Sequence, residues 1–123
     1  MSSSALGASR VGRVMSLLSA HGFRCARVSA SGQRRGSRRD ERTLAGDLIA
    51  LAEIRGCPSL LVEVGGVGKR LGPAFAELRG SIMPGFAPLV VRYVARKRWI
   101  YVDEHRRFTT VPAALAAIRE AAP

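Results

Sequence analysis

Two carboxylates stand in otherwise apolar stretches of this 123-residue chain, and their chemistry is that of a metal site. Asp47 opens the run DLIALAEI at residues 47–54, and Glu63 lies near the end of the run SLLVEV at residues 59–64. Charged groups are unusual inside apolar runs, and two carboxylates held side by side repel each other. A divalent cation between them would remove the repulsion. Hard oxygen ligands suit Mg²⁺ or Mn²⁺, whose bound waters can attack a phosphodiester.

The element that would bring these carboxylates together is a hairpin. The two apolar runs are separated by Arg55-Gly56-Cys57-Pro58, and they predict paired strands that are covered on both faces. In such a hairpin Asp47 and Glu63 come within a residue or two of being opposite. The alternative, which spacing alone leaves open, is two unrelated edge carboxylates that each pair with an arginine.

The remaining patterns predict a fold of the α/β class. The expected elements are a helix over 10–20, a strand over 23–29, the hairpin strands 47–54 and 59–64, a helix from Pro73 to Arg79, strands over 89–95 and 99–102 around a basic turn at Arg96–Arg98, and a C-terminal helix that begins near Pro112. We expect a single domain over residues 1–123, with a mixed central sheet flanked by helices and with residues 1–9 frayed.

The charge of the chain indicates an anionic partner. Twenty basic residues against nine acidic ones give a net charge of +11, and nucleic acid is the usual partner of such a surface. A GC-rich genome would explain arginine in place of lysine, but not the shortage of acids. Residues 30–45 predict a flexible basic loop without aromatic residues, which favours phosphate contacts over base stacking. The basic turn at Arg96–Arg98 is a second expected patch.

The other polar residues favour an ordinary cytoplasmic setting. Cys25 and Cys57 form no CxxC pattern and predict reduced core thiols. His21 and His105 have no partner at metal-ligand spacing and predict surface histidines. The chain shows neither the apolar core of a signal peptide nor an apolar run long enough to cross a membrane. We therefore expect no membrane association and a cytoplasmic protein of a bacterium, an archaeon or a phage.

Three short motifs resemble a known family. R-x-x-x-S-G at Arg27–Gly32, G-D-L-I-A at Gly46–Ala50 and V-E-V at Val62–Val64 are similar to motifs of the archaeal-type Holliday junction resolvases. These enzymes belong to the PD-(D/E)xK, restriction-endonuclease-like nucleases. The segments P-L-V-V-R-Y-V and R-W-I-Y-V look like the closing strands of that family. The resemblance covers roughly residues 10–103, follows the family's element order, and implies a restriction-endonuclease-like sheet flanked by helices.

The resemblance implies roles for individual residues. Asp47 and Glu63 would bind the catalytic Mg²⁺ or Mn²⁺, and Ser31 would help to place the substrate strand. The expected nucleic-acid contacts are Arg27, Ser31, Arg34, Arg35, Arg38, Arg39 and Arg42. Resolvases of this kind are homodimers, because a four-way junction needs two symmetric cuts. The implied partners are therefore branched or duplex DNA and a second copy of the chain.

The chain departs from the family's pattern at two positions. The family places a lysine two residues after the glutamate, where it assists the attacking water and the scissile phosphate, but this chain has Gly65 there. The family also places a glutamate in the first helix, whereas residues 10–20 contain no acid.

Lys69 is the nearby lysine that could replace the missing one. Four residues along a strand span about 13 Å, too far unless the chain folds back. Gly65, Gly66 and Gly68 permit a reversal, since glycine tolerates the backbone angles that it needs. Arg70 could supply charge but no proton at neutral pH. The alternatives are an inactive relic and a site that another residue completes.

The leading prediction is a metal-dependent DNA endonuclease of the junction-resolving kind, with Asp47, Glu63 and Lys69 as catalytic residues. The alternative is a catalytically inactive nuclease-fold module that binds DNA or RNA through the same basic loop. A basic structural protein unrelated to nucleases is a third possibility that only the charge supports. The segment G-G-V-G-K-R at Gly65–Arg70 departs from a nucleotide-binding P-loop, which requires Gly where Glu63 stands.

Overall fold

The computed structural model of the chain describes residues 3–28 and 46–121, with side chains from Ser9 onward. The elements of this part of the chain are α1 (Ser3–Ser19), β1 (Phe23–Arg27), β2 (Leu48–Ala52), β3 (Ser59–Gly65), α2 (Leu71–Ser81), β4 (Phe86–Val94), β5 (Lys97–Tyr101), β6 (Arg107–Phe108) and α3 (Val111–Ala121).

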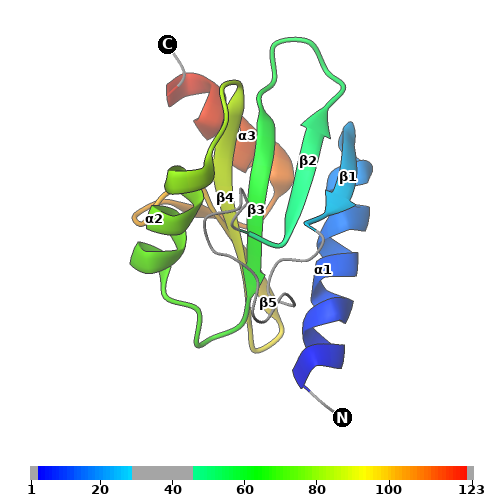
Figure 1. Cartoon of the computed structure of the whole chain (residues 1–123), viewed down its shortest axis with the longest axis vertical. Coiled ribbons are helices and arrows are strands. Elements are labelled where there is room, and N and C mark those ends of the chain that lie inside the picture. The colour runs from blue at the N-terminus through cyan, green and yellow to red at the C-terminus, as the bar shows by residue number, and fades with distance from the viewer. Residues whose placement is uncertain (1–2, 29–45, 122–123) are drawn as a thin grey trace, which may run out of the picture.

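The strands form one mixed sheet whose spatial order is the order of the chain (Figure 1). β1, β2 and β3 pair antiparallel, as do β4, β5 and β6. β3 and β4 pair parallel, because α2 carries the chain back across the sheet between them. This crossover makes β3 and β4 the central strands, and both end at the same edge of the sheet.

Helices cover both faces of the sheet. α1 and α3 pack on one face, where Leu60, Val62 and Val64 of β3 are buried against them. α2 packs on the other face, where Leu61 is buried against Phe75 and Leu78. Side chains alternate along a strand, so Glu63 and Gly65 share the α2 face with Leu61. The catalytic candidates therefore lie on the side of the sheet that one helix covers.

The predicted fold class is confirmed: the protein is α/β, with a mixed sheet flanked by helices. α1 begins at Ser3 rather than at Arg10, so it includes residues for which we expected fraying. Ala5, Leu6 and Ala8 are good helix formers, which accounts for the longer helix. The two-residue strand β6 was not predicted, since so short a strand carries no periodic signal.

Two strand boundaries differ from the prediction near the second hairpin. β4 begins at Phe86, ahead of Pro88, although proline is unfavourable within a sheet. It is tolerated because β5 pairs only with residues from Val90 onward, so the edge at Pro88 needs no amide donor. The basic turn is also shorter than predicted. Val94 pairs with Lys97, so Lys97 and Arg98 belong to β5 rather than to the turn.

The hairpin of β2 and β3 forms as predicted, with Leu48 opposite Val62. Its strands differ in burial, however. β3 is covered on both faces, whereas Leu51 of β2 is 44% exposed on the α2 side. Within the described residues, no helix has the length and hydropathy needed to cross a bilayer.

Candidate active site

Asp47 lies directly before β2, where the regular ladder to β3 ends. Its N–H donates to the carbonyl of Val62 over 2.7 Å, and its Oδ2 accepts the N–H of Val64 over 2.8 Å. The carboxylate therefore replaces a backbone acceptor and holds Asp47 against the two residues that flank Glu63. Gly46 makes the bend possible, because its φ is +97° and a Cβ there would lie 3.0 Å from the Val62 carbonyl oxygen.

Glu63 is half-buried on the α2 face of β3. Burial raises the pKa of its carboxyl group, since removal from water disfavours the charged form. The hydrogen bond and the charge of Lys69 oppose this rise, whereas the negative charges of Asp47 and Glu77 add to it. Glu77 is exposed on α2 and was not singled out from the sequence, because it lies on a helix with no motif around it.

Lys69 returns to Glu63 from the turn that follows β3. Its Nζ donates a short hydrogen bond to Glu63 Oε2, and the two side chains are 28% and 15% exposed. The reversal is closed by a 3.0 Å hydrogen bond from the Lys69 N–H to the Gly66 carbonyl. The ammonium thus lies at the carboxylate instead of pointing into solvent.

Gly65 makes room for this lysine. A Cβ at position 65 would lie 2.6 Å from Cε, 2.9 Å from Cβ and 3.1 Å from Cγ of Lys69. The Lys69 side chain consequently lies over the strand position from which the family lysine would project. The absence of a lysine at position 65 and the position of Lys69 are linked, because a side chain at position 65 would exclude the Lys69 side chain from its observed place.

Two arginines near this turn were not predicted as site residues. Arg92 of β4 pairs with Gly65 and donates to the Val67 carbonyl over 3.1 Å. Arg10 of α1 places Nη1 2.7 Å from the position of a Cβ on Gly66, and its guanidinium lies 5.7 Å from the centre of the Tyr93 ring. An arginine within the apolar strand Phe86–Val94 was the available signal for Arg92. Arg10 carried no local signal, because its place depends on how α1 packs.

The residues present fit a hard divalent cation. Asp47 is near enough for its negative charge to contribute to the raised pKa of Glu63, and a cation would compensate that charge. In the described ranges no group of three or more metal-ligating side chains gathers. A pair of carboxylates is nonetheless a suitable protein contribution for Mg²⁺, which keeps several of its waters.

Most predicted nucleic-acid contacts fall outside the described residues. Ser31, Arg34, Arg35, Arg38, Arg39 and Arg42 all lie between residues 29 and 45. Arg27 ends the edge strand β1 and is exposed, with one nitrogen 3.6 Å from the position of a Cβ on Gly12. In the second basic patch, Arg96 and Lys97 are exposed and Arg98 is half-buried.

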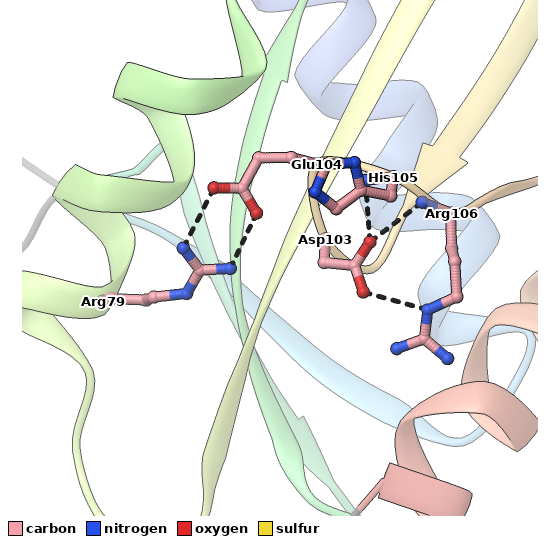
Figure 2. Close-up of polar contacts among 5 residues, drawn as sticks. All are labelled: Arg79, Asp103, Glu104, His105 and Arg106. Carbon is pink, nitrogen blue, oxygen red and sulfur yellow. Dashed lines mark hydrogen bonds and ion pairs between the residues drawn. The ribbon is translucent and has the colours of Figure 1, made fainter.

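Charged side chains also gather in the connection between β5 and β6 (Figure 2). Glu104 binds both terminal nitrogens of Arg79, at 3.1 and 3.2 Å. Asp103 accepts the backbone N–H groups of His105 and Arg106, each at 2.8 Å, and also the Arg106 side chain. This cluster folds a surface loop onto α2, and the exposed His105 ring belongs to the same loop.

The remaining candidates have structural roles. The Nδ1 of His21 lies 3.0 Å from the Leu17 carbonyl at the end of α1, and the residue is half-buried rather than on the open surface. Cys25 and Cys57 are free thiols, as predicted, but they lie at the margin of the core rather than within it. Burial raises the pKa of the Cys25 thiol, so it is not an activated nucleophile.

Comparison with known proteins adds no family to this geometry: no protein-family model and no curated protein matches the chain.

Proposed function

We propose that this chain is a metal-dependent DNA endonuclease that hydrolyses phosphodiester bonds, with Asp47, Glu63 and Lys69 as its catalytic residues. The observation that carries the proposal is the return of the Lys69 ammonium to Glu63, across the position that Gly65 leaves open. A residue four positions further along the chain thereby restores the Asp–Glu–Lys set that the resemblance to junction resolvases implies.

Each residue of the set would have a distinct task. Asp47 and Glu63 would hold Mg²⁺ or Mn²⁺ through their carboxylate oxygens. The Val64 N–H fixes one oxygen of Asp47. The bound ion would supply a more acidic water and neutralise charge on the phosphate. Lys69 would place positive charge beside the scissile phosphate and orient the attacking water.

Charge supports DNA as the substrate. The net charge of +11 favours a polyanion. The narrower proposals, a four-way junction as substrate, a homodimer as the active form and a cytoplasmic location, come from the resemblance and the composition. A comparison of branched and linear substrates tests the first, and light scattering tests the second.

The deciding experiment compares cleavage by the wild type and by Asp47→Asn. The substrates are a labelled four-way junction and a duplex of the same sequence, each with Mg²⁺ or Mn²⁺. The amide can still accept the Val64 N–H, so the fold is retained while the negative charge is lost. We expect cleavage to fall by about 10³-fold or more, because the cation loses a ligand.

Glu53→Gln is the matched control. Glu53 is an exposed acid that belongs to the same hairpin and pairs with Arg24. It lies toward the opposite end of the hairpin from Glu63. Its replacement removes the same charge and should leave cleavage unchanged. DNA binding by the wild type without cleavage under either metal would contradict the enzyme proposal.

One observation favours a second candidate, an inactive relative that binds DNA or RNA. The ion pair with Lys69 already compensates the charge of Glu63, so the carboxylate needs no cation for its stability. For such a module, Mg²⁺ would leave thermal stability unchanged. A metal-dependent rise in the unfolding temperature, lost in Asp47→Asn, separates the two candidates without any cleavage assay.

A further inference from the structure

Arg92 is a cation within the otherwise apolar strand β4. The strand has the sequence FAPLVVRYV, and Val90 and Val91 before the arginine are buried. Parallel pairing places Arg92 beside Gly65, the glycine that makes room for Lys69. Its side chain lies on the α2 face, as Glu63 does, because Val90 two residues earlier is buried on that face.

The guanidinium connects the core to the turn. Its Nη1 donates to the Tyr101 hydroxyl over 3.3 Å, and its Cζ lies 5.7 Å from the centre of the Tyr101 ring. Tyr101 is only 5% exposed and packs with α2, so this end of the contact is rigid. The other terminal nitrogen, Nη2, donates to the Val67 carbonyl over 3.1 Å.

Few hydrogen bonds hold the backbone of the turn. Gly66, Gly68 and the preceding Gly65 leave its backbone many alternative conformations, and the Val67 side chain is 71% exposed. Within the described residues, the turn is held by the hydrogen bond from the Lys69 N–H to Gly66, by the one from Arg92 to Val67 and by the ion pair of Lys69 with Glu63. Among the described residues the Nε of Arg92 is buried without a hydrogen-bond partner, so only its two terminal nitrogens make the contacts described above.

We propose that Arg92 is a positioning residue: by anchoring the Val67 carbonyl to Tyr101, it holds the Gly66–Lys69 turn in the conformation that returns Lys69 to Glu63. A planar guanidinium has two terminal nitrogens and reaches both oxygens at once, which a lysine ammonium at the same position cannot do. The catalytic consequence rests on the proposed function, whereas the anchoring itself does not.

The first test measures amide hydrogen exchange by NMR and needs no activity. The Lys69 N–H, which closes the turn, reports on the turn directly. In Arg92→Gln we expect it to exchange about tenfold faster or more, the effect of losing a hydrogen bond from a charged donor. The Ala114 N–H of α3 should be unaffected and shows that the fold is intact. Arg92→Lys should behave like Arg92→Gln.

Arg55→Gln is the charge-matched control, since Arg55 is exposed at the far end of the β2–β3 hairpin. Unchanged Lys69 exchange in Arg92→Gln, or equal acceleration of the Lys69 and Ala114 amides, would overturn the anchoring role.

The second test moves the lysine onto the strand. Gly65→Lys combined with Lys69→Gly removes every Lys69 atom that would obstruct a side chain at position 65. In the original background, Arg92→Gln should lower the single-turnover cleavage rate about tenfold or more, with DNA affinity no weaker than in Arg55→Gln. In the relocated background, Arg92→Gln should have no effect on the rate.

The two tests fail in different ways. Equal loss of cleavage in both backgrounds would mean that Arg92 contacts the substrate, and the positioning role would be wrong. Absence of cleavage in the wild type would contradict the proposed function only, because Lys69 amide exchange still decides whether Arg92 holds the turn.

Discussion

Paired charges gather in two regions of this molecule, at the end of β3 and in the connection between β5 and β6. Glu63 and Lys69 are 15% and 28% exposed, whereas Glu104 and Arg79 are 33% and 48% exposed. The pKa of Glu63 is raised, mainly by burial, despite its ion pair. The pKa of Glu104 is lowered by the hydrogen bonds from Arg79. A glutamate paired with a cationic side chain therefore has a raised pKa in one place and a lowered pKa in the other.

The comparison shows that burial, more than the presence of a partner, decides whether the pKa of a paired glutamate rises or falls. At Asp103 burial also acts to raise the pKa, but hydrogen bonds from the His105 N–H and from the Arg106 side chain and N–H outweigh it. The loop carboxylates are thus stable as anions without any ligand. Burial disfavours the anionic form of Glu63, and the ion pair with Lys69 offsets this only in part.

Among the changes that test this contrast between the two regions, the largest expected effect comes from forcing Lys69 out of its place at Glu63. In Gly65→Ala the new Cβ would lie within 3.1 Å of three Lys69 side-chain atoms. The Lys69 ammonium should therefore move toward solvent, where the charged groups of the connection between β5 and β6 already lie. We expect cleavage of junction DNA to fall about 10²-fold, the contribution of one positioned acid–base group. Gly68→Ala is the matched control, since a Cβ there meets nothing within 4 Å. Equal rates in the two variants would contradict the steric role of Gly65.

A moderate effect is expected in the pH dependence of stability, with opposite signs in the two regions. The pKa of Glu63 is raised above its ordinary value of 4.5, so its contribution is fully present below that value and is lost as the pH rises through the folded pKa. The pKa of Asp103 is lowered from its ordinary value of 3.8, so its contribution is present above that value and is lost as the pH falls through the folded pKa.

Urea unfolding at a series of pH values from acid to neutral, with a chelator present, measures the contributions of Glu63 and Asp103 to stability. Relative to the wild type, Glu63→Gln should become more stable as the pH rises. Asp103→Asn should lower the free energy of unfolding by about 1 kcal/mol at neutral pH and by less in acid. Difference curves with the same sign for the two variants would refute the contrast between the regions.

The smallest effect is expected at Glu104. Glu104→Gln removes the charge that pairs with Arg79 but leaves Arg79 over the Phe75 ring, with its Cζ 5.2 Å from the ring centre. Exposed ion pairs contribute little, because water and salt already screen them. We expect an unfolding temperature indistinguishable from that of the wild type at high salt and no change in cleavage. A clear loss of cleavage would mean that the surface cluster takes part in the site.

Much of the fold could be predicted because it follows from local sequence patterns. Apolar alternation and turn residues located β2 and β3, and the approach of Asp47 to the two residues that flank Glu63 follows from a hairpin of consecutive strands. The possibility that Lys69 folds back could be predicted from Gly65, Gly66 and Gly68. Its actual direction could not, because glycine permits many turns and selects none.

The contacts that the patterns missed are all between distant segments. Arg92 meets Val67 only because α2 returns the chain and lets β4 pair parallel with β3. Arg10 reaches Gly66 only because α1 packs on the opposite face of the sheet. No periodicity within one segment reports on either event.

The sequence by itself determined the α/β class, the excess of positive charge, the hairpin that carries Asp47 and Glu63, and the glycines after β3. These follow from composition and from the periods of strands and helices, which act over a few residues. Tertiary structure alone decided that Glu63 is half-buried and that Lys69 lies over Gly65. It also decided that Arg92 spans the distance from Tyr101 to the turn. Those features depend on which elements pack together, since burial and the direction of a flexible turn are set by neighbours distant in the chain.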